Sequence, residues 1–262
     1  MNKLLLISLT IFISCQNNIY INTDKNTYYD DISDITYLNG YFYSTNYDLS
    51  GHAGSQIDLI KFGINSESIY LDNSYDLEMN GQGYFAITND ETDLYLQSRN
   101  TNLILKCSAI GERAYIKFDP FVFKDSITSY DTITKMQWQP CGLAYKHESD
   151  SLLTIHRNLD IINQYRIKII STNLEIDSTS FEKIIHFEFV DTTNYGIYAM
   201  EYNNSLIYLL GVDTTQNDIL ITLNNNYDIT SIDTIPDSTV VGISIKDQDL
   251  YLSYRNKKIE RW

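Results

Sequence analysis

Three dipeptides of one kind recur along the chain and carry residues well suited to binding an anion. They are Arg99-Asn100, Arg157-Asn158 and Arg255-Asn256, and they hold half of the six arginines. A guanidinium group recognises carboxylate, sulfate or phosphate through two parallel hydrogen bonds. The recurrence therefore predicts an interrupted ring of arginines on one face of the protein, with His156 beside it.

The same dipeptides also have a purely structural interpretation. Asparagine is a favoured turn residue, and each arginine would then pair with an acidic residue of a neighbouring repeat. Two more residues join the candidate ligand site, His52 and Trp138, and each lies in a long predicted loop. An aromatic ring near an arginine suits stacking on a sugar or a peptide. Alternatively, it covers the junction between two repeats.

Signatures of catalysis are scarce. The sequence has no Gly-x-Ser-x-Gly, His-Glu-x-x-His, EF-hand or P-loop motif, and its four histidines are scattered. We therefore expect a binding protein more than an enzyme, with no cofactor and no metal, and the sequence assigns no catalytic residue.

Composition indicates both the kind of fold and the partners to exclude. The 262 residues include 19 Lys+Arg and 34 Asp+Glu, which gives a formal net charge of −15. An acidic chain without a basic tract lacks the electrostatic footprint of a nucleic-acid-binding protein. The chain has 22 Tyr and only 3 Pro, and it is poor in alanine, which favours strands over helices.

A repeat of about fifty residues organises the chain. Each copy predicts a strand, an acidic turn, a second strand, a polar turn and a third strand. The second strands begin at Tyr41, Leu94, Leu152, Leu206 and Leu250. This is the period of a propeller blade of four antiparallel strands.

Fourth strands and a closing strand complete the predicted architecture, an all-β, five-bladed β-propeller. The expected fourth strands are Ile69–Asp72, Ile116–Asp119, Leu174–Asp177 and Ile229–Asp233. The last copy ends at Trp262 after its third strand, and Ile19–Asp24 is expected to complete it. Such closure removes an open sheet edge.

Four copies open their first strand with a glycine: Gly83, Gly142, Gly196 and Gly242. First strands crowd at a propeller axis, where a residue without Cβ permits close backbone approach. Alternatively, these glycines only end the preceding loops. The weaker first copy begins at Asp34.

Two segments resemble a known repeat type. Pro140-Cys-Gly-Leu-Ala144 and Asp93-Leu-Tyr-Leu96 are similar to the strands of NHL-repeat and lactonase-like propellers. The resemblance covers about residues 19–262 as architecture and implies a propeller with a central channel. The lactonase-like relatives place a metal in that channel, and no matching ligand set is found in this sequence.

The N-terminus predicts a membrane anchor. Lys3 precedes the apolar run 4–13, which is too short to span a bilayer. Phe12-Ile13-Ser14-Cys15 resembles a bacterial lipobox, which implies a signal peptide over 1–14, lipidation of Cys15, a tether over 15–18 and a propeller domain over 19–262. An ordinary secretory signal and a cytosolic protein are the alternatives.

The remaining Cys107 and Cys141 could pair outside the cytoplasm or be two buried thiols.

The expected function is that of a lipid-anchored module of the cell envelope, at the outer membrane or cell surface, which binds an anionic ligand, a glycan or a protein. The alternatives are a hydrolase or lactonase acting on a saccharide or ester, and a structural accessory subunit of an envelope complex. Carboxylates or a metal in the axial channel would favour the enzyme. A bare channel with an apolar, tyrosine-rich outer patch would favour the accessory role.

Overall fold

A computed structural model describes most of the strands of this chain. The described residues are 19–20, 32–46, 59–64, 69–75, 84–98, 103–108, 118–122, 130–131, 136–158, 165–173, 178–187, 190, 196–236, 239–255 and 258–262. Within them the structure is almost entirely β, and its one helical element is a three-residue 3-10 turn, η1 (His147–Ser149). None of the described helical structure is long and apolar enough to cross a membrane.

The strands form five antiparallel sheets, which we number in chain order. Sheet 1 contains β2 (Ile32–Leu38), β3 (Tyr41–Asn46), β4 (Leu59–Ile64) and β5 (Ile69–Tyr75). Sheet 2 contains β6 (Tyr84–Asn89), β7 (Asp93–Ser98), β8 (Leu103–Ser108) and β9 (Phe118–Val122). Sheet 3 contains β10 (Tyr130–Asp131), β11 (Met136–Lys146), β12 (Ser151–Asn158), β13 (Tyr165–Asn173) and β14 (Ser178–Phe187).

The last two sheets follow the same order from the inside outwards. Sheet 4 contains β15 (Ile197–Asn203), β16 (Leu206–Val212), β17 (Asp218–Asn224) and β18 (Ile229–Thr234). Sheet 5 contains β19 (Val240–Lys246), β20 (Asp249–Tyr254), β21 (Lys258–Arg261) and β1 (Ile19–Tyr20).

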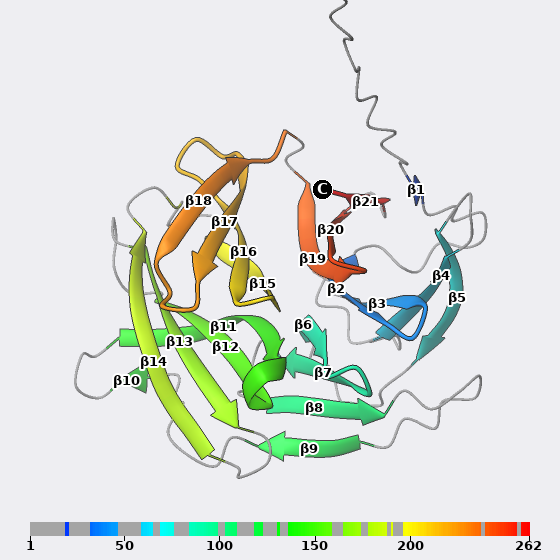
Figure 1. Ribbon diagram of the computed structural model, residues 1–262, viewed down its shortest axis with the longest axis horizontal. Helices are drawn as coiled ribbons and strands as arrows, with labels where there is room; N and C mark the ends of the chain where they lie inside the picture. The colour runs from blue at the N-terminus through cyan, green and yellow to red at the C-terminus, as the bar shows by residue number, and fades with distance from the viewer. Residues whose placement is uncertain are drawn as a thin grey trace, which may run out of the picture.

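The sheets stand around a common axis, with the first full strand of each sheet innermost (Figure 1). These inner strands are β2, β6, β11, β15 and β19. Each contacts the inner strand of the next sheet, and β19 contacts β2, so the ring is closed. The chain is therefore an all-β propeller, as the repeat predicts.

The N-terminal strand completes the C-terminal sheet. Ile19 pairs with Ile259 and Tyr20 with Lys258, in antiparallel register. The predicted closure is confirmed at these residues. Outer strand β21 thus gains a hydrogen-bonded neighbour from the opposite end of the chain, which ties the two termini together.

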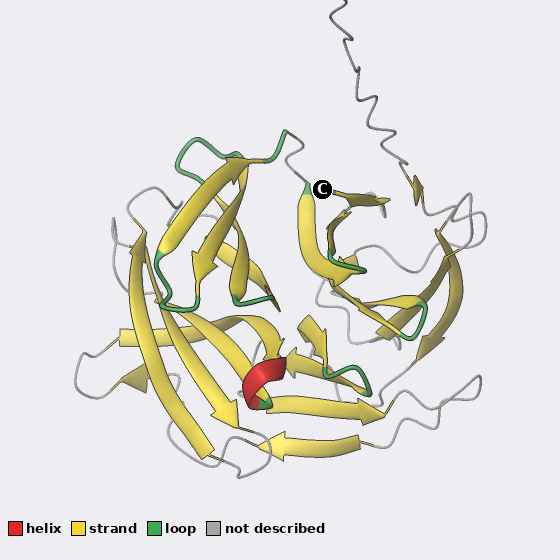
Figure 2. Cartoon of the chain, viewed as in Figure 1, coloured by secondary structure: helices red, strands yellow, loops and turns green. Residues whose placement is uncertain are grey.

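Tight turns join the first and second strand of each sheet, and in sheet 3 this connection contains η1, drawn red (Figure 2). These first turns contain residues with positive φ, namely Asn39, Glu91, Asp150, Asn204, Ser205, Asp247 and Gln248. Asparagine and aspartate tolerate this conformation better than other side chains. The polar residues that the repeat places between its first two strands therefore have a conformational role.

The hydrophobic core lies between neighbouring sheets, because the residues of each strand face alternate sides. In β12, Leu153 and Ile155 pack in a cluster with strands of sheet 4. Leu152, whose side chain faces the other side of this strand, packs in a second cluster with Tyr95 and Ile104 of sheet 2. Sheet 3 thus contributes apolar side chains to two interfaces.

Close approach at the axis is confirmed for two of the predicted glycines. A Cβ on Gly242 would lie 2.6 Å from the Cα of Asp34 in the next sheet. A Cβ on Gly142 would lie 2.8 Å from Ile155 and 3.1 Å from Met200. Gly196 instead has a φ of 56°, which makes it a turn glycine, and Gly83 lies outside the described residues.

Sheet 3 departs from the prediction. Its described outermost strand is β14, over residues 178–187, and the expected fourth strand 174–177 lies outside the described residues. Its inner strand β11 begins at Met136, inside the predicted loop 119–141. Pro140 in this stretch lacks a backbone N–H and is therefore more typical of a loop than of an inner strand. The fourth strand of sheet 2 begins at Phe118, two residues beyond the predicted Ile116.

Candidate functional site

Asp34 lies at the propeller axis and joins three inner strands. Its Oδ1 accepts hydrogen bonds from the backbone N–H of Ile35 at 3.0 Å and of Ile243 at 3.2 Å. Its Oδ2 accepts one from the N–H of Ile87 at 3.3 Å. The carboxylate therefore satisfies inner-edge N–H groups of sheets 1, 2 and 5, which would each cost about 1–3 kcal/mol if left buried and unpaired.

Glu201 on β15 approaches this carboxylate from sheet 4. Burial raises the pKa of Glu201 to about 8, against one opposing hydrogen bond from the N–H of Tyr202 to its Oε1 at 3.0 Å. Burial also raises the pKa of Asp34, and the charge of Glu201 adds to that shift. The axis thus carries two interacting carboxyl groups, one of which exchanges its proton near neutral pH.

Further polar side chains link the inner strands next to Asp34. The Oγ1 of Thr88 accepts the N–H of Tyr145 at 3.2 Å, which joins sheets 2 and 3. The Nδ2 of Asn89 donates to the Oγ1 of Thr36 at 2.6 Å and to the carbonyl of Tyr37 at 3.1 Å, which joins sheets 2 and 1. These bonds hold the inner strands in fixed register.

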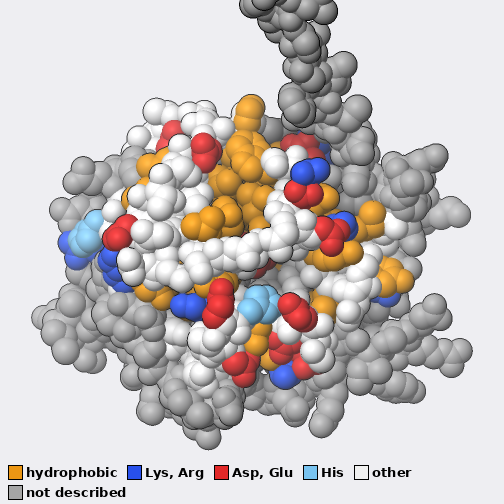
Figure 3. All heavy atoms as spheres, in the orientation of Figure 1, with side chains coloured by type: hydrophobic (Ala, Val, Ile, Leu, Met, Phe, Trp, Pro, Cys, Tyr) orange, Lys and Arg blue, Asp and Glu red, His pale blue; other side chains and the backbone are white. Residues whose placement is uncertain are grey.

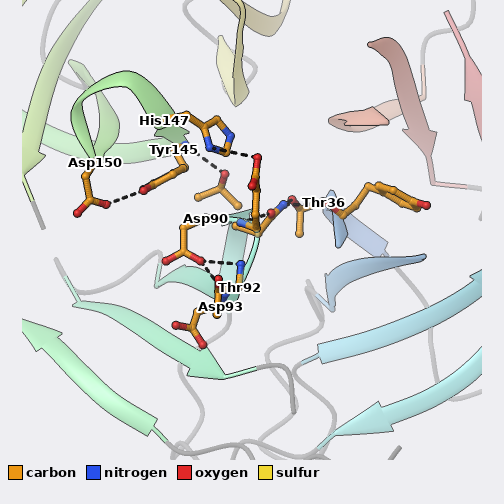
Figure 4. A network of polar contacts seen from close by, with 11 residues as sticks. Thr36, Asp90, Thr92, Asp93, Tyr145, His147 and Asp150 are labelled. Carbon is orange, nitrogen blue, oxygen red and sulfur yellow. Dashed lines mark hydrogen bonds and ion pairs between the residues drawn. The ribbon is translucent and has the colours of Figure 1, made fainter. Parts of the chain in front are cut away.

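The first turns of sheets 2 and 3 carry a connected polar network (Figure 4). The Tyr145 hydroxyl donates to the Oδ1 of Asp150 at 2.5 Å, and the Tyr95 hydroxyl donates to the Oδ2 of Asp90 at 2.8 Å. The two rings stack with centroids 6.4 Å apart. Burial and the adjacent carboxylates raise the pKa of both phenols, so both remain protonated donors.

Asp90 also shapes its own turn, because its Oδ1 accepts the N–H groups of Thr92 at 2.9 Å and Asp93 at 2.6 Å. Lys106 adds a positive charge, with its Nζ 2.9 Å from the Oδ2 of Asp93. Burial lowers the pKa of Lys106, but the bond to Asp93 and the surrounding carboxylates raise it by a larger amount, so the pKa lies above its ordinary value.

His147 stands at the inner end of this network. Its ring meets that of Tyr145 edge-on with centroids 4.8 Å apart, and its Nδ1 lies 3.7 Å from the Oε1 of Glu91. The His147 side chain is 46% exposed and that of Glu91 81%, so both are accessible to a ligand. We call Asp90, Glu91, Tyr145, His147 and Asp150 the turn network.

The face that carries the turn network is rich in acidic side chains, with a histidine among them near its middle (Figure 3). The described residues nevertheless include no group of three or more His, Cys, Asp or Glu placed to hold a metal. The chemistry that this face offers is hydrogen bonding by carboxylates, phenols and an imidazole, together with proton exchange at Glu201.

Three of the sequence-predicted site residues lie together on two paired strands of sheet 3. Arg157 pairs with Gln139, and Asn158 pairs with Trp138 in the register of β11 and β12. His156 is 1% exposed and Arg157 is 8% exposed. Trp138 therefore lies in a strand and not in the predicted loop, and its side chain lies outside the described part.

Arg255 follows β20, and it is exposed. Its positive charge reaches Tyr198 of sheet 4, whose pKa is raised by burial and by Asp218 and partly lowered by Arg255. The Tyr198 hydroxyl lies 3.2 Å from the Oδ1 of Asp218. Arg255 thus lies near a neighbouring repeat, and its pairing with an acidic residue stays a prediction.

The other predicted site residues lie outside the described residues. They are Arg99, His52 and Cys15, and the side chain of Cys107 joins them. Cys141 is a buried thiol in the core cluster with sheet 4.

The sequence analysis did not identify Asp34, Glu201 or Tyr145 as functional. A signal was present for the first two. Asp34 stands where the other copies have glycine, and Glu201 interrupts an otherwise apolar first strand. A carboxylate inside a buried strand requires a local reason, because its desolvation is costly. Tyr145 gave no such signal among 22 tyrosines.

No family model matches this sequence, and no curated protein matches it. Similar folds occur among solved structures. A glutaminyl cyclase from Myxococcus xanthus aligns with a TM-score of 0.55 at 11% identity over 88% of this chain and 90% of its own. An exo-β-1,3-galactanase from Phanerochaete chrysosporium, solved with galactose, aligns with a TM-score of 0.56 at 8% identity over 94% of this chain and 63% of its own.

A third similar structure is a putative oxidoreductase (glucose dehydrogenase) from Thermus thermophilus. It aligns with a TM-score of 0.51 at 9% identity over 88% of this chain and 96% of its own. At these identities the likeness concerns the fold alone. Together with the closed ring of inner strands, it identifies the chain as a β-propeller.

Proposed function

We propose that this protein is a lipid-anchored, five-bladed propeller of the bacterial cell envelope that binds a saccharide ligand. The observation that carries the binding role is the turn network, in which polar side chains of two neighbouring sheets are each fixed by a hydrogen bond within their own sheet. Such preorganisation lowers the entropy cost of binding. The saccharide class is suggested by the likeness to a galactanase solved with galactose.

The membrane anchor is part of this proposal. Lipidation at Cys15 would leave residues 16–18 as a tether before β1 at Ile19. Loss of Lys3 with the signal would change the net charge from −15 to −16. An anionic lipid surface repels such a domain, so the acyl chains and not the protein surface would hold it there.

Replacing Cys15 with Ser should move the protein from the membrane fraction to the soluble fraction. Unchanged partitioning would refute the anchor.

Binding is tested with the full chain in detergent, titrated with galactose and β-1,3-linked galactose oligomers by calorimetry. The Tyr145→Phe variant removes the hydroxyl that donates to Asp150 while keeping the ring. We expect at least tenfold weaker binding. Tyr208→Phe, on β16 of sheet 4, is the matched control and should bind like the parent. Equal affinity of all three proteins would exclude the turn network as the binding surface.

A hydrolase acting on a saccharide or ester is the second candidate, and Glu201 is the observation that favours it. A carboxyl group with a pKa of about 8 is protonated at neutral pH and can donate a proton to a leaving group. Asp34 nearby is committed to three backbone N–H groups, which leaves Glu201 as the candidate proton donor. Hydrolysis of nitrophenyl galactoside or nitrophenyl acetate that disappears in Glu201→Gln would establish this candidate.

The predicted arginine ring remains a proposal for an anionic ligand on the opposite face. Arg157 and Trp138 share one end of sheet 3, and Arg255 occupies the corresponding end of sheet 5. Loss of binding to a sulfated saccharide in an Arg99, Arg157 and Arg255 triple variant that still folds would support it. A triple variant that does not fold would indicate a structural role for these turns.

A further inference from the structure

Three buried polar side chains between sheets 2 and 3 have hydrogen-bonding atoms without partners. The unpartnered atoms are the Oε1 of Gln97, the Oγ1 of Thr154, and both ring nitrogens of His156. The three residues are 0–1% exposed. Folded proteins rarely leave buried polar atoms unpaired, so several of them in one interface indicate that something else occupies that place.

All three side chains face the same interface. Leu152, in register with them on β12, packs in the cluster that contains Tyr95 and Ile104 of sheet 2. Thr154 and His156 alternate with Leu153 and Ile155, which pack towards sheet 4 instead. Thr154 and His156 therefore point towards sheet 2.

Gln97 points back from sheet 2. It follows Tyr95 by two residues on β7, and the ring of Tyr95 stacks on that of Tyr145 in sheet 3. Its cross-strand partner Ile104 belongs to the cluster shared with sheet 3. Gln97 therefore faces Thr154 and His156 from the opposite wall.

The three residues also lie within about 7 Å of one another along the strand direction. Strands β7 and β12 begin at the first turns of their sheets, with Asp93 and Ser151. At about 3.3 Å per residue, Thr154 lies about 10 Å, Gln97 about 13 Å and His156 about 17 Å from those turns. Gln97 thus falls between the other two along the interface.

The hydrogen-bonding capacity of the group defines what it can hold. Burial, together with the charge of Lys168, lowers the pKa of His156 to about 3, so the ring is neutral and offers one donor and one acceptor. Thr154 offers a donor and an acceptor, and the Oε1 of Gln97 only accepts. An anion only accepts hydrogen bonds, and a metal ion accepts none, so neither can pair with both the donors and the acceptors of this group. A hydroxyl group both donates and accepts.

We propose that Gln97, Thr154 and His156 form a buried site for the hydroxyl groups of a small neutral saccharide or polyol. This rests on the proposed saccharide-binding function and places part of the ligand between sheets 2 and 3. His156 pairs with Pro140, and Arg157 is the next residue towards the end of sheet 3 opposite its first turn.

The test compares two isosteric substitutions. Thr154→Val removes a hydroxyl of the site. Thr45→Val removes an equally buried and equally unpartnered hydroxyl from sheet 1. Calorimetry with galactose and with glycerol on the full chain should show binding to the parent and to Thr45→Val, and at least tenfold weaker binding to Thr154→Val. If Thr154→Val fails to fold, Gln97→Met carries the same comparison.

A spectroscopic readout locates the contact. The ¹⁵N resonances of the His156 ring should shift when galactose is added, while those of exposed His186 on β14 should not. Galactose binding that leaves Thr154→Val and the His156 resonances unchanged would overturn the buried site and leave the proposed function standing. Absence of saccharide binding by the parent would refute the proposed ligand, and this inference with it. A site filled by water alone, insensitive to both probes, would also overturn the inference.

Discussion

The Oδ1 of Asp34 accepts the backbone N–H of Ile243 at 3.2 Å, although the two residues are 209 positions apart. The bond joins the inner strand of the first complete sheet to that of the last. The same side chain also bonds to Ile87 in sheet 2. One carboxylate therefore closes the ring at its axis, while the pairing of β1 with β21 closes it at the rim.

Replacing Asp34 with Ala should destabilise the protein by about 3–5 kcal/mol, because three buried N–H groups lose their acceptor at about 1–3 kcal/mol each and part of this is recovered by water. Urea denaturation followed by tryptophan fluorescence measures the change. Asp233→Ala removes an exposed carboxylate from β18, and it should change the free energy of unfolding by about 0.5 kcal/mol or less. Equal effects of both substitutions would show that Asp34 does not clamp the sheets.

Glu201 should make the protein less stable as the pH rises. Its pKa is about 8 in the folded protein, against an ordinary value of 4.5. Between these values the unfolded chain has lost the proton that the folded protein keeps, so the free energy of unfolding falls by up to about 1.4 kcal/mol per pH unit.

The Glu201→Gln variant lacks this group, so the difference in stability between the variant and the parent should grow in favour of the variant from pH 5 to pH 8. Urea denaturation at several pH values measures it. Asp233→Asn, exposed on β18, is the control and should leave the pH profile unchanged. A Glu201→Gln profile parallel to that of the parent would place the Glu201 pKa near its ordinary value.

The architecture could be predicted because it depends on features that repeat. Strand patterns and acidic turns recur about every fifty residues. The last copy lacks its fourth strand, and closure by Ile19 followed from that missing strand. What the repeat could not predict is where its copies differ. Asp34 replaces a repeated glycine, and two of the three N–H groups that it accepts belong to strands far apart in the chain.

Site residues were harder to predict because their environments are made by neighbouring sheets. His156 was selected for its position beside Arg157, and its burial between two sheets follows only from the strand register. Tyr145 becomes a fixed donor through Asp150 and the ring of Tyr95. Neither relationship is visible in the spacing of residues within one copy.

Gly242 should tolerate no side chain. A Cβ there would lie 2.6 Å from the Cα of Asp34 and 2.8 Å from the N of Ile35, and backbone cannot move aside as a side chain can. Gly242→Ala should therefore cost about 2–3 kcal/mol through overpacking. Differential scanning calorimetry measures the fall in melting temperature.

Gly40→Ala is the informative control for that substitution. Gly40 has a φ of 88° but open space around its Cβ position, so an alanine there costs only backbone strain, about 1 kcal/mol. A loss at Gly242 no greater than the loss at Gly40 would mean that sheets 5 and 1 are not in close contact at the axis.

His156 should weaken the protein in acid. Its pKa is about 3 in the folded protein, against an ordinary value of 6.5, so below pH 6.5 the unfolded chain binds a proton that the folded protein excludes. The stability that a neutral His156 permits is present above pH 6.5 and is lost as the pH falls towards 3, by up to about 1.4 kcal/mol per unit.

In His156→Gln, urea denaturation at pH 4 and pH 7 should show a smaller acid loss than in the parent. His147→Gln, at an exposed position, should retain the parental loss. An acid loss that is the same in all three proteins would show that the His156 ring is not excluded from protonation, and hence that it is not enclosed between sheets 2 and 3.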